Sequence, residues 1–121
     1  MDCAKSQDLL QPADLDVSVQ LPSELVRISS QGLINLSPWH VMPRELAKKR
    51  LIGLRGRYRN KYVPFARRQD NDDLACIDPD QPGRVVVVHD FESEGFERGA
   101  TYQTFWDWFQ MAIEDMIEFE P

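Results

Sequence analysis

The sequence contains few of the residues that mark secreted proteins or metal centres. Its two cysteines, Cys3 and Cys76, lie far apart in no metal-binding or redox spacing, so we expect free thiols in a reducing compartment. The two histidines, His40 and His89, are too few for a histidine-rich metal site. No signal-peptide pattern follows Met1, and no run of about 18 apolar residues occurs. We therefore expect a cytoplasmic protein with no membrane span and no metal or other cofactor.

The chain also lacks an overall excess of positive charge, and its charge is unevenly divided. The formal net charge is -6, which argues against a general nucleic-acid binder. Residues 44–68 carry ten basic side chains against one acidic side chain, whereas residues 70–121 carry fourteen acidic against two basic. The local charges of +9 and -12 predict either two faces of opposite sign or one half folded onto the other.

The composition is typical of one globular domain. Of the 121 residues, 42% are hydrophobic and 28% are charged, which is too apolar for a disordered chain. Residues 1–20 contain no aromatic residue and no helical stripe, so we interpret them as a loosely held arm. Within this arm, residues 16–19 can add an edge strand. Residues 21–121 are expected to form the single domain.

Four consecutive valines, Val85 to Val88, give the strongest strand signal. Each branched side chain favours a strand, and the absence of polar residues between them predicts that both sheet faces are covered. We expect this strand over 84–91, paired in an antiparallel hairpin with a strand over 74–78 across the loop at 79–83. Shorter strands are expected at 33–36 and 62–66, with a turn or helical turn around Trp39 and an exposed acidic turn at 92–95.

Three helices are expected. The first covers residues 21–28 and the second runs from Pro43 to Gly53 or Gly56. The third, over residues 102–119, is the clearest, because its apolar side chains fall within one stripe while Asp107, Glu114 and other acids lie outside it. Together with the strands, these helices predict an α+β domain.

Two sets of polar residues suggest a metal site or a catalytic site, and for each set we favour a structural interpretation. The acidic turn at 70–73, with Asp78 and Asp80, resembles a calcium loop but has Leu74 at its fifth position, so we favour a solvated turn. Cys76 and His89 share a sheet face if Asp78 pairs with Val85, and lie on opposite faces if the register slips by one residue. Because free cysteine is commonly buried, we favour a structural Cys76 over a nucleophile.

Basic and aromatic residues alternate over residues 55–62, a composition that single-stranded nucleic-acid binders use. The alternative is that the tyrosines enter the core while the arginines are solvated or meet the chain's own acids, which the negative net charge favours. Trp106 and Trp108 are interpreted as core and core rim. Trp108, at the edge of the stripe, is expected to be partly exposed, where tryptophan often anchors an interface.

The order of these segments resembles the SUKH superfamily, within it the branch related to the fungal Smi/Knr cell-wall regulators. The resemblance covers residues 21–119 and rests on short motifs, which are Leu21-Pro22, Gly32-Leu33, Val63-Pro64-Phe65-Ala66, Leu74-Ala75-Cys76-Ile77-Asp78, the valine strand and Tyr102-Gln103-Thr104-Phe105-Trp106-Asp107-Trp108-Phe109. It departs from the family at residues 71–73, where many members have glycines. It also departs at Trp106 and Trp108, which are larger than the residues usual at these positions.

The resemblance implies an α+β fold with a mainly antiparallel sheet of about four to six strands and helices packed on it. It also implies a function, because bacterial members are commonly immunity proteins that bind and block secreted polymorphic or contact-dependent toxins. No catalytic residues define the family. We therefore expect a non-enzymatic protein that binds a cognate toxin, such as a nuclease or deaminase. The expected contact residues are Asp70, Asp72, Asp73, Glu92, Glu94, Asp107, Trp108 and Glu114.

Two other functions are compatible with the sequence. The basic segment at 44–68 can serve a regulatory adaptor or a nucleic-acid-binding module, whose binding would weaken steeply with salt. Cys76 and His89 can serve an enzyme, which would require a thiol more reactive than that of a model peptide.

Overall fold

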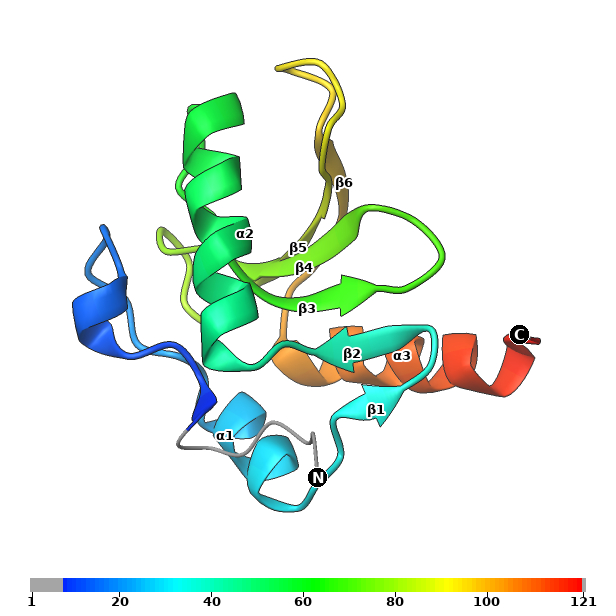
Figure 1. Cartoon of the computed structure of the whole chain (residues 1–121). Coiled ribbons are helices and arrows are strands. Elements are labelled where there is room, and N and C mark those ends of the chain that lie inside the picture. Colours follow the sequence, from blue (N-terminus) through cyan, green and yellow to red (C-terminus); the bar gives the residue numbers. More distant parts are fainter. Residues whose placement is uncertain (1–7, 121) are drawn as a thin grey trace.

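The valine segment forms strand β5 (Val85–His89), which lies between β4 (Asp73–Ile77) and β6 (Arg98–Tyr102) in the computed structural model, where residues 8–120 are described (Figure 1). The sheet has six strands in the order β1-β2-β3-β4-β5-β6. Every neighbouring pair is antiparallel. This confirms the predicted α+β fold with a mainly antiparallel sheet of four to six strands.

Two of the six strands were not predicted. The first half of the sheet contains β1 (Asn35–Leu36), β2 (Trp39–Val41) and β3 (Val63–Arg68), so the predicted turn around Trp39 is wrong. The predicted start of the last helix at Tyr102 is also wrong, because Tyr102 ends β6. Strand β2 has only three residues, and the sequence of β6, Arg-Gly-Ala-Thr-Tyr, has little of the β-branched pattern that marks a strand. Pairing with β5 along the sheet edge forms β6 instead.

Residues 8–120 contain three α-helices: α1 (Ser23–Ser30), α2 (Arg44–Arg57) and α3 (Phe105–Glu118). Helices α2 and α3 contact strands of the sheet, and α1 contacts α3. Helix α2 covers one face of the sheet and α3 the other (Figure 1). All four valines of β5 are buried, as expected for a strand covered on both sides. No helix within residues 8–120 is long and apolar enough to cross a membrane.

Helix α3 supplies the aromatic centre of the core. The Thr104 side chain caps its first turn by accepting a hydrogen bond from the backbone N–H of Asp107. Trp108 is 0% exposed, and its ring centroid lies 5.6 Å from that of Trp39 and 4.9 Å from that of Phe65. The expected partial exposure of Trp108 is therefore wrong. The unpredicted strand β2 brings Trp39 against it, and Trp106 is the tryptophan of α3 that reaches the surface.

The described part of the amino-terminal arm packs on the domain. Leu9 and Leu10 are buried in the core, and residues 12–14 form a short 3-10 helix. Asp14 accepts hydrogen bonds from Arg44 of α2 at 2.8 and 2.9 Å. Apolar burial and an ion pair attach this part of the arm to the domain. The edge strand expected at 16–19 does not form, and residues 1–7 lie outside the described residues.

Candidate functional site

The segment from Asp90 to Glu97, which we call the β5–β6 loop, extends beyond the sheet at the end where α2 also ends (Figure 1). Two phenylalanine side chains on it face solvent, Phe91 at 61% and Phe96 at 74% exposure. Glu92 and Glu94 are also exposed. Large exposed apolar side chains that gather in one place are typical of a protein-binding surface.

The loop begins at a buried carboxylate that two arginines of α2 hold. The Asp90 side chain is 0% exposed and accepts hydrogen bonds from Arg57 Nε and Nη2, each at 2.7 Å, and from Arg50 Nη2 at 2.9 Å. Burial alone would raise the pKa of Asp90, but the hydrogen bonds from Arg57 and Arg50 outweigh it and hold the pKa below its ordinary value. The charged carboxylate therefore fixes the start of the loop to α2.

The sequence of α2 makes this attachment possible. Arg50 and Arg57 are seven residues apart, which places them two turns apart on one face of a helix. Between them lies Gly53, where an added Cβ would be 2.6 Å from Arg57 Nη2. Of the two predicted helix ends, Gly53 is wrong and Gly56 lies one residue from the observed end. The missing side chain at Gly53 leaves room for the Arg57 side chain to fold back over the helix. The helix ends at Arg57 instead, where Tyr58 takes an extended backbone.

Further hydrogen bonds hold the rest of the loop. The Tyr58 hydroxyl donates to the backbone oxygen of Glu92 at 2.7 Å. At the other end of the loop, the buried Glu97 carboxylate accepts from Asn60 Nδ2 at 2.8 Å and from the backbone N–H of Gly95 at 2.7 Å. The loop backbone is thus fixed from beneath while its outer side chains remain exposed.

Phe91 has an unusual backbone conformation. Its φ of 70° lies in the left-handed region, which is uncommon for a bulky residue. The backbone N–H of Phe91 donates to Asp90 Oδ1 at 2.9 Å, and Arg57 Cζ lies 4.1 Å from the centroid of the phenyl ring. These contacts hold one ring face against the guanidinium and leave the ring largely exposed. Backbone strain of this kind is found preferentially at functional sites.

The structure brings five of the eight expected contact residues to one end of the sheet. Asp73 pairs with His89 across β4 and β5, and its Oδ1 lies 2.7 Å from His89 Nδ1. The turn that carries Asp70 and Asp72 therefore lies at the same sheet end as the loop that carries Glu92 and Glu94. Asp107 and Glu114 are exposed but lie on α3, and the buried Trp108 is not accessible to a partner.

Sequence reasoning missed Phe91 and Phe96 as candidate contact residues. Phe91 follows the buried valine strand and was assigned to it, whereas the structure ends β5 at His89. A signal was present in the composition of the segment Phe-Glu-Ser-Glu-Gly-Phe, because two aromatic residues inside an acidic turn have no core to enter.

Most arginines of the basic segment are engaged with acids of the same chain. Besides the arginines that bind Asp14 and Asp90, Arg55 donates to both carboxylate oxygens of Asp16, and Arg68 contacts Asp70 and Asp115. Arg50, Arg57 and Arg68 meet acids of residues 70–121, as one interpretation of the charge asymmetry predicted, whereas Arg44 and Arg55 meet Asp14 and Asp16 of the amino-terminal arm. This arrangement gives the nucleic-acid alternative less support than the sequence alone did.

The structure does not bring Cys76 and His89 together. Cys76 pairs with Val86 and Ile77 with Val85, which is the register that places Cys76 and His89 on opposite sheet faces. Burial raises the pKa of the Cys76 thiol well above its ordinary value. A buried protonated thiol is a poor nucleophile.

The acidic turn does not gather into a metal site. Among residues 8–120, no group of three or more histidine, cysteine, aspartate or glutamate side chains is arranged to hold a metal ion. Asp78 instead accepts a hydrogen bond from the backbone N–H of Asp80 and contacts Arg84.

Comparison of the chain with models of protein families, with curated proteins and with solved structures finds no match.

Proposed function

We propose that this chain is a non-enzymatic protein-binding domain that neutralises a cognate toxin, as its resemblance to the immunity proteins of the SUKH superfamily implies. The observation that carries the proposal is the β5–β6 loop, which presents Phe91 and Phe96 beside Glu92 and Glu94 on a backbone fixed by buried ion pairs. The partner surface that fits this loop has basic side chains around an apolar pocket.

The two phenyl rings supply the affinity in this proposal. Burying a phenylalanine side chain contributes about 1.5–3 kcal/mol, and aromatic anchors commonly dominate the binding energy of an interface. Because hydrogen bonds already order the loop, little conformational entropy is lost on binding. The acids have a different role, since they attract a basic partner at long range and orient the encounter.

The proposal is tested with the purified chain and the toxin encoded beside its gene. We expect a stable complex in which toxin activity is lost. The double variant Phe91→Ala, Phe96→Ala should bind at least about a hundredfold more weakly, because both anchors are removed. Ile52→Ala is the matched control, since Ile52 is an exposed apolar residue on α2 outside the loop and its loss should leave binding unchanged.

Absence of a complex at micromolar concentrations would overturn the proposed function. A complex that the double phenylalanine variant forms as tightly as the parent would instead show that binding uses another surface. The double variant Glu92→Gln, Glu94→Gln tests whether the acids act on the rate of association rather than on the lifetime of the complex. We expect slower association and a weaker salt dependence, with a smaller change in the dissociation rate, in surface-immobilised binding kinetics.

A further inference from the structure

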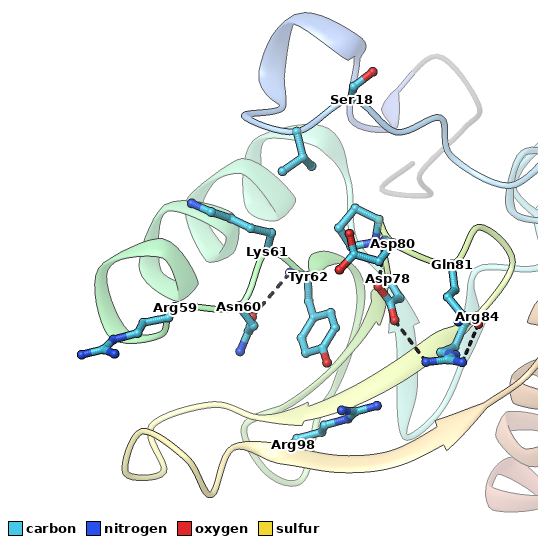
Figure 2. Close-up of a pocket in the computed structure, with 12 residues that line it drawn as sticks. Ser18, Arg59, Asn60, Lys61, Tyr62, Asp78, Asp80, Gln81, Arg84 and Arg98 are labelled. Atoms are coloured by element: carbon cyan, nitrogen blue, oxygen red, sulfur yellow. Dashed lines mark hydrogen bonds and ion pairs between the residues drawn. The ribbon is translucent and has the colours of Figure 1, made fainter.

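A polar cavity of about 560 Å³ lies on the side of the domain that carries the β4–β5 loop (Figure 2). The residues that line it come from four segments. They are residues 59–62 after α2, residues 78–81 with Arg84 between β4 and β5, Arg98 at the start of β6, and Val17 with Ser18. The volume falls within the range of about 300–1,000 Å³ that is usual for small-molecule sites.

The cavity gathers positive charge in a negative protein. Four basic side chains line it, Arg59, Lys61, Arg84 and Arg98, against the two carboxylates of Asp78 and Asp80. The lining therefore carries a formal charge of +2, although the whole chain carries -6. Arg84 and Arg98 are the two basic residues that follow residue 70, and both lie here.

These four basic side chains are paired more loosely than the arginines of α2. The shortest distance from Arg84 to Asp78 is 3.5 Å, from Arg59 to Glu94 3.5 Å, and from Lys61 to Asp16 4.0 Å. Arg98 has no ion pair within residues 8–120, and the buried Nε of Arg84 has no hydrogen-bond partner there. By contrast, the ion pairs of Arg44, Arg50, Arg55 and Arg57 measure 2.6–2.9 Å. Arg84 Nη2 also donates to Gln81 Oε1 at 2.5 Å, which holds the Arg84 side chain at the cavity wall. Arg98, Arg59 and Lys61 have the donors that are most available to an anion.

We propose that this cavity binds the phosphate monoester of a small hydroxylated molecule, with the phosphate group between Arg84 and Arg98. Guanidinium groups match the geometry of phosphate oxygens, and the +2 lining matches the charge of a phosphate dianion. The cavity is larger than a phosphate ion needs, so the rest of the ligand occupies it as well.

The remaining polar groups suit the hydroxylated part of the ligand. Asp78 and Asp80 accept hydrogen bonds from hydroxyl groups. Burial raises the pKa of Tyr62, so its hydroxyl stays protonated and can donate; in Figure 2 it points toward Arg98. Asn60 Nδ2 donates to Glu97 and Gln81 Oε1 accepts from Arg84, so the side-chain oxygen of Asn60 and the side-chain N–H groups of Gln81 are the atoms that they offer to a ligand. Ligands with these features are a sugar phosphate and a nucleoside monophosphate, and both share the phosphate ester.

The test is a titration of the isotope-labelled full chain, followed by amide chemical shifts at low salt. The probes are ribose 5-phosphate, adenosine 5′-monophosphate, inorganic phosphate and uncharged ribose. We expect saturable shifts confined to the cavity segments with at least one of the two esters, weaker binding of inorganic phosphate and no binding of ribose. Absence of saturation with both esters would overturn the proposal, as would inorganic phosphate binding as tightly as the esters.

Two substitutions separate the site from general electrostatic attraction. Arg98→Ala removes an exposed side chain with no ion pair, so the fold should be kept while ester binding weakens about tenfold or more. Lys49→Ala removes the same charge from the exposed side of α2 and should change binding less than about twofold. Equal weakening by both variants would overturn the assignment. Arg84→Lys keeps a charge beside Asp78 but loses the guanidinium fork, and should weaken the ester as Arg98→Ala does.

Discussion

The arginines beneath the β5–β6 loop and the arginines around the cavity differ in their environment, because the first bind a buried acid and the second have longer ion pairs or none among residues 8–120. Arg57 binds Asp90 with two hydrogen bonds of 2.7 Å, whereas Arg59, two residues later, is 94% exposed and approaches Glu94 only to 3.5 Å. The change occurs where α2 ends, because the helix directs Arg57 inward and the extended chain directs Arg59 outward. Ion pairs with two short bonds to a buried acid hold the structure, whereas exposed pairs at 3.5 Å contribute little to it.

The largest effect expected from this difference is the loss of Asp90. Asp90→Ala leaves Arg50 and Arg57 without their buried acid and frees the start of the loop, so we expect a loss of about 3–5 kcal/mol in the free energy of unfolding. Urea denaturation measures it. Asp80→Ala removes a carboxylate from the cavity, where the side chain is exposed, and should cost less than about 0.5 kcal/mol. Equal losses in the two variants would contradict the distinction between the regions.

The second prediction concerns the stability of the fold at acidic pH. The hydrogen bond from Arg44 lowers the pKa of Asp14 to about 2, and that of Asp90 is also lowered. Since the unfolded value is about 3.9, these carboxylates stabilise the fold above about pH 4 and lose that contribution as the pH falls toward 2. Midpoints of urea unfolding should therefore fall between about pH 4 and pH 2. The Asp14→Asn variant should be less stable than the parent at pH 5 and lose less on acidification, so parallel curves would refute this account.

The smallest effect on stability is expected at the cavity. Arg59→Ala and Arg98→Ala remove exposed side chains with loose pairing or none among residues 8–120, so each should change the free energy of unfolding by less than about 0.5 kcal/mol. Urea denaturation of both variants beside Asp90→Ala completes the series. A loss above about 2 kcal/mol in either would mean that the cavity charges hold the fold as the α2 arginines do.

The elements that the sequence predicted are those with strong local patterns. The valine strand, the hairpin with β4 and the apolar stripe of α3 were recognisable because burial imposes a period or a continuous apolar run. The positions of β2, β6 and Trp108 could not be predicted in this way. Strand β2 has only three residues, the sequence of β6 is rich in small residues, and Trp108 lies at the edge of the apolar stripe of its helix. The register of β4 and β5 was also open, and it decides which face His89 occupies.

The candidate site could be predicted only in part. Glu92, Glu94 and the acidic turn were expected at the surface because their side chains are charged. The exposure of Phe91 and Phe96 was not expected, because an apolar side chain by itself indicates burial.

By itself, the sequence determined an α+β domain with a doubly covered valine strand, an amphipathic carboxyl-terminal helix and an uneven charge. These follow from local propensity and from the cost of exposing apolar surface. Only the tertiary structure decided which charged side chains form ion pairs within the fold. Asp90, for example, binds Arg57 and Arg50, which are 33 and 40 residues away in the sequence. Whether a charge is buried and paired or free to bind depends on distances between segments remote in the chain, and no local pattern encodes those distances.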